Sequence, residues 1–447
     1  MPHNLQQSQQ ASCQSTVPAE QKTGQYKVTH ADADADPKTH EILAEASQYI
    51  LNTYNRPSLV FTHGKGCYLY DQGNRRYLDF SAGIAVNALG HSDEEVSRVL
   101  AEQSSQLVHI SNLFHHPWGG ELAKVLVEST RETGAFQASK VFLANSGTEA
   151  NEGALKFARK WGKLVTDKED KFEIVSCLNG FHGRSMGSLS CTPNPKYQKP
   201  FLPLVPGVKH ISFNDTESIE ASITEKTCGV ILETVQGEGG IFAANVEFLR
   251  ALRKRCDEVG ALLIFDEIQC GIGRTGKLWA FENFPSDIVP DILTMAKPLA
   301  NGFPIGAILM NEKVAEKIKI GEHGTTFGGS PLGCRVALSV FNRIRRPEFL
   351  AHVNEIGGHL KQGLKVITEG NPLVKDVRGL GLILGVEFTV DPTPLVKLAR
   401  ERGLIIITAS NNTVRLVPPL ILSQEEADEG LEILKEVFEE FRNLNQV

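Results

Sequence analysis

The 447-residue sequence has no Cys-x-x-Cys pair and no long apolar run, and these two absences exclude whole classes of protein. Its 8 cysteines are scattered, which is typical of free thiols in a reducing compartment and not of a disulfide framework. No apolar segment approaches the ~20 residues that a membrane-spanning helix needs. His109, His115 and His116 lack the partner pattern of a metal site, so we expect ordinary surface and core histidines there.

An excess of positive charge is also missing. The formal net charge is −7, which argues against nucleic acid or an anionic membrane as a general partner, because either requires a basic face. The first arginine is Arg56, and the lysines before it are offset by an acidic run in residues 31–37. Mitochondrial presequences are rich in arginine and poor in acidic residues, so the composition of residues 1–36 fits a disordered tail better than an import signal.

From residue 38 onward, helical patterns alternate with short apolar runs. Runs with the length of buried parallel strands occur at residues 140–144, 173–178, 229–233, 261–267 and 291–296. This alternation predicts a doubly wound α/β sheet with functional residues at the carboxyl ends of its strands. Ser92 with Glu95 predicts a capping box at the start of one helix.

The two ends of the chain predict a second, α+β lobe. Residues 66–80 are typical of a hairpin, which we expect to join the strand-like segments of the last third. Ser423 with Glu426 predicts the capped start of a final helix. The expected divisions are the tail 1–36, the N-terminal part of the small domain 37–90, the large domain 91–335 and the C-terminal small domain 336–447.

Asn145 to Thr148 lie between a predicted strand and a predicted helix. Backbone N–H groups at a helix start, with two hydroxyls and a glycine that permits close approach, are typical of a phosphate cup. Serine and threonine are also ordinary helix caps, so this motif alone leaves both interpretations open.

Gly271, Gly273 and Gly276 have the G-x-G-x-x-G spacing of dinucleotide-binding proteins. Here the strand ends near Asp266 and no helical period follows the glycines, so we interpret them as a turn. Asp266 is the more informative residue, because a buried unpaired carboxylate is costly. It is either a helix cap or salt-bridge partner, or the group that keeps a cationic ring nitrogen protonated.

Lys297 follows the apolar run 292–296, and Pro298 and Gly302 oppose a regular helix around it. A lysine held in apolar surroundings has a lowered pKa and becomes a usable amine nucleophile. The alternative is a lysine whose amine reaches solvent, as most lysine amines do.

Seven motifs in family order resemble the class III pyridoxal-phosphate (PLP) aminotransferases, from about residue 40 to the C-terminus. They are ANSGTEANEGALKFAR, FHGRSMGSL, ETVQGEGG, LIFDEIQCGIGRTG, AKPLANGFPIGA, GTTFGGSPLG and RLVPPL. Within this family the sequence resembles the enzymes that act on acetylornithine in arginine biosynthesis. The resemblance implies an α/β fold of type I, with a large doubly wound, mainly parallel-sheet domain and a smaller α+β domain. It also implies an obligate homodimer.

The resemblance assigns the cofactor contacts. Lys297 would hold PLP as a Schiff base and move a proton between substrate and cofactor, and Asp266 would pair with the ring nitrogen. Thr326 would reach the phosphate from the partner subunit. The remaining contacts, to the phosphate and around the ring, would be Ser146, Gly147, Thr148, Phe181, His182 and Gln269.

Two arginines would let one pocket accept two substrates. By resemblance, Arg184 would bind the distal carboxylate of each substrate, and Arg415 the α-carboxylate of 2-oxoglutarate. Glu238 would neutralise Arg415 when the bound substrate lacks that group, because a bare buried charge is costly. Thr325 and Ile84 would complete the substrate contacts. Ile84 stands near the position where ornithine aminotransferases have a tyrosine, which favours the N-acetylated substrate.

Two positions depart from the family pattern. Ser92 and Asp93 replace the His-Pro that many relatives have after Gly90-His91, which changes a helix start. Cys270 replaces a common threonine, and we expect a small buried residue there and not a reactive thiol.

These features predict transamination of N-acetyl-L-ornithine with 2-oxoglutarate, giving N-acetyl-L-glutamate 5-semialdehyde and L-glutamate. Ornithine and 4-aminobutyrate are the alternative amino donors. A catalytically silent PLP-binding protein and a nicotinamide-dependent oxidoreductase are the alternative classes. By resemblance we expect the mitochondrial matrix, with the cytoplasm as the alternative. The expected partners are these small molecules and a second copy of the chain, with no nucleic acid, membrane or metal ion.

Overall fold

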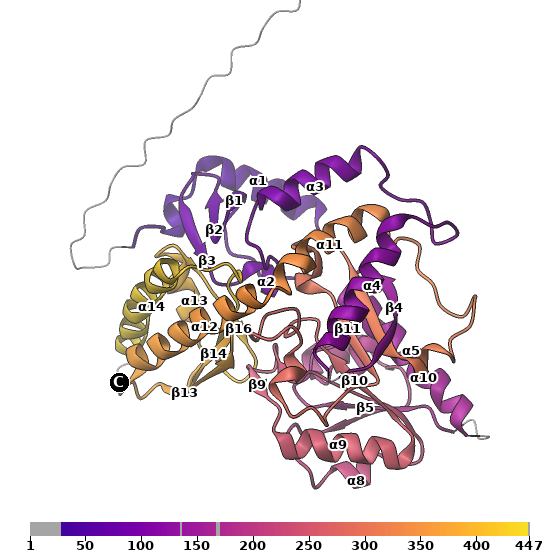
Figure 1. The fold of residues 1–447 in the computed structure, drawn as a ribbon. Coiled ribbons are helices and arrows are strands. Elements are labelled where there is room, and N and C mark those ends of the chain that lie inside the picture. Colours follow the sequence, from indigo (N-terminus) through magenta and orange to yellow (C-terminus); the bar gives the residue numbers. More distant parts are fainter. Residues whose placement is uncertain (1–27, 135, 167–169, 446–447) are drawn as a thin grey trace, which may run out of the picture.

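The computed structural model describes residues 28–134, 136–166 and 170–445 of the chain. Figure 1 shows a larger lobe built on the central part of the chain and a smaller lobe that combines the N-terminal hairpin with the C-terminal third. The tail predicted for residues 1–27 lies outside the described residues. Among the helices that are described, none is long and apolar enough to cross a membrane.

The larger lobe is built, within the described residues, on a seven-stranded sheet of order β4-β12-β11-β10-β7-β5-β6. β12 runs antiparallel to both of its neighbours, and the remaining neighbours pair in parallel. The strands are β4 Ala138–Ala144, β5 Glu173–Cys177, β6 Val208–Ile211, β7 Thr227–Leu232, β10 Leu262–Asp266, β11 Ile292–Met295 and β12 Gly306–Asn311. This confirms the predicted mainly parallel α/β sheet.

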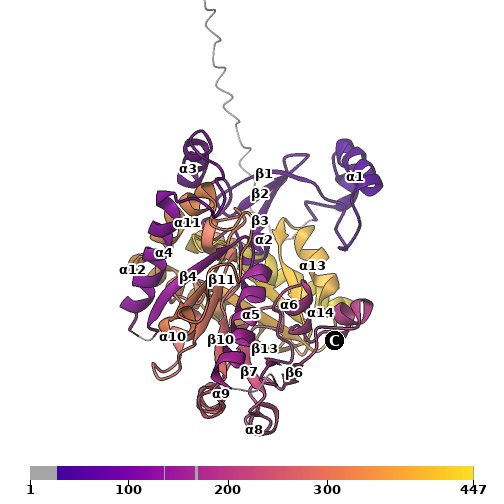
Figure 2. The ribbon, with the colours of Figure 1, turned by 90° about the vertical axis from the view of Figure 1, so that its right-hand side faces the viewer.

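Helices cover both faces of this sheet, which explains its nearly continuous apolar strands. Along β10, Ile264 packs in the cluster that contains α5 residues, whereas Leu263 and Phe265 pack in the cluster that contains α9 residues. In Figure 2, α4 and α11 lie together beside the edge strand β4. The helices of this lobe are α3 Glu94–Ser104, α4 Pro117–Glu132, α5 Gly147–Val165, α6 Met186–Ser190, α7 Pro195–Gln198, α8 Ile219–Ser222, α9 Val246–Val259, α10 Glu312–Ala315 and α11 Pro331–Ile344.

The smaller lobe contains an antiparallel sheet of order β13-β14-β17-β16, on which α12 and α14 pack. A second sheet, β1-β2-β3-β15, joins the N-terminal hairpin to the C-terminal segment through parallel pairing of β3 with β15, as predicted. The strands are β1 Phe61–Lys65, β2 Tyr68–Asp71, β3 Arg76–Asp79, β13 Val374–Leu380, β14 Ile383–Phe388, β15 Leu404–Ile405, β16 Ile407–Ala409 and β17 Thr413–Leu416. The helices are α1 Pro37–Tyr49, α2 Ala82–Ala85, α12 Pro347–Thr368, α13 Thr393–Arg400 and α14 Gln424–Leu444.

Local helix signals give mixed outcomes. The capping box at Ser423 and Glu426 is confirmed, since each side chain accepts the backbone N–H of the other residue. The capping box at Ser92 is wrong: α3 is capped by Asp93, whose carboxylate accepts the N–H of Val96 at 3.0 Å. Ser92 instead has a φ of 50°, a left-handed conformation. The domain boundary proposed at residue 335 lies inside α11, whose residues contact α3 and α4.

The predicted disordered tail is too long at its C-terminal end. Residues 28–36 are described, and they lie against the smaller lobe. Asp32 forms an ion pair with Arg400 at 2.8 Å, and Asp36 caps α1 by accepting the N–H of Lys38. Two carboxylates of the acidic run in residues 31–37 therefore have specific partners.

Candidate active site

The carboxyl ends of neighbouring parallel strands bring the predicted cofactor contacts together, as the topology of such sheets requires. A cavity of about 300 Å³ opens there, lined by residues that follow β4, β5, β7, β10 and β11. Every cofactor contact predicted within this chain lines the cavity: Ser146, Gly147, Thr148, Phe181, His182, Asp266, Gln269 and Lys297.

One end of the cavity is the start of α5. Ser146 caps the helix, since its hydroxyl accepts the N–H of Glu149 at 3.3 Å. Gly147 packs so closely that a Cβ at this position would lie 2.8 Å from side-chain carbons of Ile268. The first N–H groups of a helix have no intrahelical acceptor, so those of Gly147 and Thr148 are suited to an anion. The Thr148 hydroxyl already makes a 2.6 Å hydrogen bond with Ser185, which ties α5 to the loop after β5.

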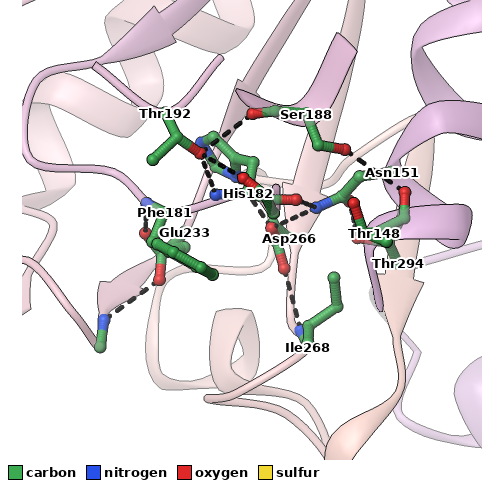
Figure 3. A network of polar contacts seen from close by, with 12 residues as sticks. Thr148, Asn151, Phe181, His182, Ser188, Thr192, Glu233, Asp266, Ile268 and Thr294 are labelled. Atoms are coloured by element: carbon green, nitrogen blue, oxygen red, sulfur yellow. Dashed lines mark hydrogen bonds and ion pairs between the residues drawn. The ribbon is translucent and has the colours of Figure 1, made fainter. Parts of the chain in front are cut away.

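Asp266, at the end of β10, is fixed by donors on both of its oxygens (Figure 3). Its Oδ2 is 2.8 Å from Asn151 Nδ2 and 2.8 Å from His182 Nδ1, and its Oδ1 accepts the N–H of Ile268 at 3.0 Å. Thr294 in turn donates to Asn151 Oδ1 at 2.8 Å. The carboxylate is thus buried and held in one orientation, which suits a group that must face a cationic ring nitrogen.

His182 is a buried neighbour of Asp266. Burial alone would lower the pKa of His182, but its hydrogen bond to Asp266 and the carboxylate's charge outweigh burial and raise the pKa. Within the described part of the chain, His182 Nε2 is buried and has no hydrogen-bond partner. Asp266 is therefore hydrogen-bonded to a buried imidazole whose second nitrogen has no partner among the described residues.

Lys297 follows β11 at the base of the same cavity and begins a short 3₁₀ turn, Lys297–Ala300. Burial, with the positive charge of Arg415 as the next cause, lowers the pKa of its amine to about 8. At neutral pH an appreciable fraction of such an amine is unprotonated, which is the form that attacks a carbonyl carbon. The structure places Lys297 in the lining of this cavity, and its role as a nucleophile stays a prediction.

Glu233, directly after β7, is a site residue that the sequence analysis missed. Its two oxygens accept the N–H groups of Phe181 at 3.0 Å and Gly237 at 3.1 Å. Burial raises the pKa of this carboxyl to about 7. A signal was present in the sequence, because Glu233 ends an apolar run just as Asp266 does.

A second cavity, of about 620 Å³, is lined by Arg415 and Ile84, two of the predicted substrate contacts. Arg415, 2% exposed, donates to Glu238 at 2.9 Å and to Gln269 at 3.1 Å. Glu238 and Arg415 both line this cavity, and Gln269 lines the first one, so the Arg415 side chain connects the two. Ile84 is 43% exposed, at a left-handed φ of 66° in the turn α2. The expected pairing of Glu238 with Arg415 is thus present.

Arg184 lines the cavity that contains Lys297, and its guanidinium carbon lies 3.5 Å from the centre of the Tyr197 ring. Among the residues that the structure describes, Arg184 takes part in no ion pair. The site therefore presents one arginine with a carboxylate partner, Arg415, and one without, Arg184. The second is available to a carboxylate of a bound molecule.

Two predicted site residues, Thr325 and Thr326, lie outside both cavities, and Cys270 is buried. The Thr325 hydroxyl accepts from Asn145 at 3.0 Å, beside the start of α5, and Thr325 lines neither cavity within this subunit. Thr326 is exposed and also lines neither cavity. Cys270 is 1% exposed and its pKa is raised by burial, so it is the small buried residue that we expected and not a reactive thiol.

Comparison with known proteins identifies the family of this chain. The family model for aminotransferase class III matches residues 49–438. The mitochondrial acetylornithine aminotransferase of Yarrowia lipolytica is 57% identical over 88% of this chain and 95% of its own length. That of Neurospora crassa is 53% identical over 92% of this chain and 90% of its own length.

Structural similarity leads to the same family. The crystal structure of the ornithine aminotransferase of Toxoplasma gondii has a TM-score of 0.85 and 30% identity, covering 91% of this chain and 96% of that one. Another structure of that enzyme is described with partial occupancy of PLP at its active site. The family model extends over both lobes and over every motif that carries the site residues. The chain belongs to the class III aminotransferases.

Proposed function

We propose that this aminotransferase uses PLP to transfer the terminal amino group of N-acetyl-L-ornithine to 2-oxoglutarate. The observation that carries the proposal is the pair of arginines around Lys297. Arg415 is neutralised by the displaceable carboxylate of Glu238, and Arg184 has no ion-pair partner among the described residues. Such a site accepts one substrate with two carboxylates and another with one, as alternating half-reactions require.

The residues around Lys297 fit PLP. The start of α5 offers free N–H groups where Gly147 leaves no room for a side chain, which suits a phosphate. Asp266 is a buried carboxylate with fixed orientation, which suits a protonated ring nitrogen, and Phe181 lines the same cavity and can cover a ring. When bound, PLP supplies an electron-withdrawing ring that stabilises negative charge at the substrate carbon.

Lys297, Asp266 and Gln269 have separate roles in the proposed reaction. The Lys297 amine, with its pKa lowered to about 8, would hold the cofactor at its carbonyl carbon and, once released by substrate, would take and return the proton at the substrate's amino-bearing carbon. Asp266 keeps the proton on the ring nitrogen, and Asn151, His182 and the Ile268 N–H keep Asp266 in place. Gln269 joins the cofactor cavity to Arg415, so it orients the group that binds the α-carboxylate of 2-oxoglutarate.

The choice of amino donor rests on the second cavity. Ile84 offers an apolar, partly exposed surface beside Arg415 and Glu238, which is suited to an acylated amine more than to a free charged one. The names of the Y. lipolytica and N. crassa relatives support the same donor and a mitochondrial location. Because the structurally similar T. gondii protein is an ornithine aminotransferase, free ornithine is the alternative donor to compare with N-acetylornithine.

A homodimer completes the proposed site. Thr326 lies on an exposed loop and lines neither cavity of its own subunit, so we propose that Thr326 of the partner subunit reaches the cofactor phosphate. Large apolar side chains are exposed nearby: Phe327 is 65% exposed, Leu113 is 85% exposed and Phe114 is 64% exposed. The Asn112 amide donates to the carbonyls of Thr325 and Gly328, which ties the two segments together. Such a surface is typical of a subunit interface.

Spectral titration of the purified protein with four amino donors tests the proposal. We expect glutamate to abolish the absorbance band of lysine-bound PLP, and N-acetylornithine to do so at the lowest concentration. A lower half-saturating concentration for ornithine or 4-aminobutyrate would keep the chemistry and replace the donor. A protein that binds PLP but does not react with glutamate would overturn the proposal. Sedimentation analysis of wild type and of Phe327→Asp tests the dimer, which the aspartate is expected to dissociate.

A further inference from the structure

Tyr197 lies against Arg184 and lines a small cavity together with Glu238, the ion-pair partner of Arg415. It belongs to the short helix α7, in a segment held by backbone hydrogen bonds to the Asn194 carbonyl and by the Gln198 amide, which donates to the Leu189 carbonyl at 3.1 Å. The side chain is half-buried, and it lines a small cavity of about 170 Å³ together with Phe181 and Glu238. Its position is therefore set by the large lobe and not by contacts with solvent.

The two ends of the Tyr197 side chain face different partners. The ring lies under the Arg184 guanidinium at 3.5 Å and meets the Phe181 ring edge-on, with 6.3 Å between ring centres. The Tyr197 side chain also lines the same small cavity as Glu238, the carboxylate that forms the ion pair with Arg415. One side chain thus connects the unpaired arginine to the carboxylate that neutralises the other.

We infer that Tyr197 is a positioning residue for the substrate exchange, in which its hydroxyl donates to the Glu238 carboxylate in their shared cavity after a dicarboxylate displaces it from Arg415. The inference rests on the proposed function, since it assumes that Arg415 binds a substrate carboxylate. Glu238 is 28% exposed at its side chain, so on leaving Arg415 it is neither fully solvated nor still paired with a cation. A hydrogen bond from Tyr197 lowers the cost of that state, because a charged acceptor gains more from a donor than a neutral acceptor does.

The Tyr197 hydroxyl also stays protonated, as a donor must. Burial, together with the negative charge of Glu238, raises its pKa above the usual value of 10.0. The aromatic ring has a separate task. A guanidinium over a ring face is held by the ring quadrupole, so the ring fixes the plane that Arg184 presents to a carboxylate. The hydroxyl and the ring therefore have separable consequences for the two substrates.

Two variants separate the effect of the Tyr197 hydroxyl from that of its ring. Tyr197→Phe keeps the ring and removes the hydroxyl, so we expect the KM for glutamate and for 2-oxoglutarate to rise about tenfold, the effect of one hydrogen bond to a charged group. The half-reaction with N-acetylornithine, which leaves Glu238 on Arg415, should change less than about twofold. Tyr197→Leu also removes the ring, and should raise the KM for both substrates.

Surface residues offer a matched control. Tyr68 donates to Glu429 at 2.9 Å, and Arg76 lies over the Tyr68 ring and pairs with the same carboxylate. Tyr68→Phe removes the same kind of hydroxyl outside the site, and neither half-reaction should change.

Calorimetry with glutarate, a dicarboxylate that cannot react, gives a readout apart from activity. The PLP-loaded Tyr197→Phe protein should bind glutarate about tenfold more weakly than wild type. Equal glutarate affinity, or an equal loss in both half-reactions, would overturn the inference. The wild-type half-reactions test the proposed function separately. If wild type reacts with both donors and Tyr197→Phe does not discriminate between them, only the role of Tyr197 fails.

Discussion

Replacing Glu238 with glutamine tests the central claim about the site. The claim is that the Glu238 carboxylate neutralises Arg415 and that one substrate must displace it. The Arg415 side chain is 3% exposed, and its Nη2 lies 2.9 Å from Glu238 Oε2. Glutamine keeps the size and the hydrogen-bonding oxygen but removes the charge. A dicarboxylate then competes with a neutral amide for Arg415 and no longer with an anion.

The magnitude follows from the geometry. At this separation and an effective dielectric constant of about 20, the gross attraction is about 6 kcal/mol. Part of it is offset because both groups lose water on pairing, and the partly exposed Glu238 is screened. We therefore expect a net cost of displacement of about 2 kcal/mol, which corresponds to about 30-fold in affinity for glutamate and 2-oxoglutarate. N-acetylornithine should bind more weakly in the variant, because an uncompensated Arg415 remains beside its apolar end.

Single-turnover half-reactions, followed by the cofactor absorbance, measure both effects. The apparent dissociation constant for glutamate should fall and that for N-acetylornithine should rise, so the ratio of the first to the second should fall. Glu387→Gln is the matched control: Glu387 pairs with Arg378 at 2.6 Å on a neighbouring strand of the same lobe, away from both cavities. That variant should lose stability without changing the ratio. Unchanged or weaker glutamate binding in Glu238→Gln would refute the claim that glutamate must displace the Glu238 carboxylate from Arg415.

Three further predictions concern the charges around the cofactor. Because the Lys297 pKa is lowered to about 8, the rate of PLP incorporation into apoprotein should rise about tenfold per pH unit below pH 8 and level off above it; a rate that still rises at pH 10 would contradict this. Asp266→Asn should slow both half-reactions by about 100-fold or more while circular dichroism stays unchanged, because the ring nitrogen loses its anionic partner. The pKa of Glu233 is raised to about 7 from 4.5, so the native state keeps a proton that the unfolded state releases, and stability should fall as pH rises from about 4.5 to 7; Glu233→Gln should flatten that part of a melting-temperature profile, and an unchanged slope would argue against this carboxyl.

The parts of the fold and site that could be predicted from the sequence are those governed by local rules. Asp266 and Lys297 each end an apolar strand, and the carboxyl ends of parallel strands converge, so their meeting in one cavity follows from topology. The helix that begins at Gln424 follows from Ser423 and Glu426 alone, because a capping box involves only residues of that turn.

The same rule failed at Ser92 because distant contacts determine the backbone there. His91 exchanges two backbone hydrogen bonds with Gly66, and Asp93 pairs with Arg343 at 2.7 Å. These contacts fix the residues on both sides of Ser92 and leave it in a left-handed conformation in which it cannot cap α3. Local propensity was overridden by partners far away in the sequence, as happens where a chain crosses between lobes.

Glu233 and Tyr197 show a different limit. Glu233 had the sequence signal that identified Asp266, a carboxylate closing an apolar run, but its function depends on which backbone groups it meets, namely Phe181 and Gly237. Tyr197 lies in a proline-rich stretch with no helical or strand period, so no pattern places it. Glu233 holds backbone groups of the site, and the role proposed for Tyr197 is of the same kind; such residues are identified by their partners. The groups that react could therefore be found from spacing along the chain, whereas the groups that orient them required the folded arrangement.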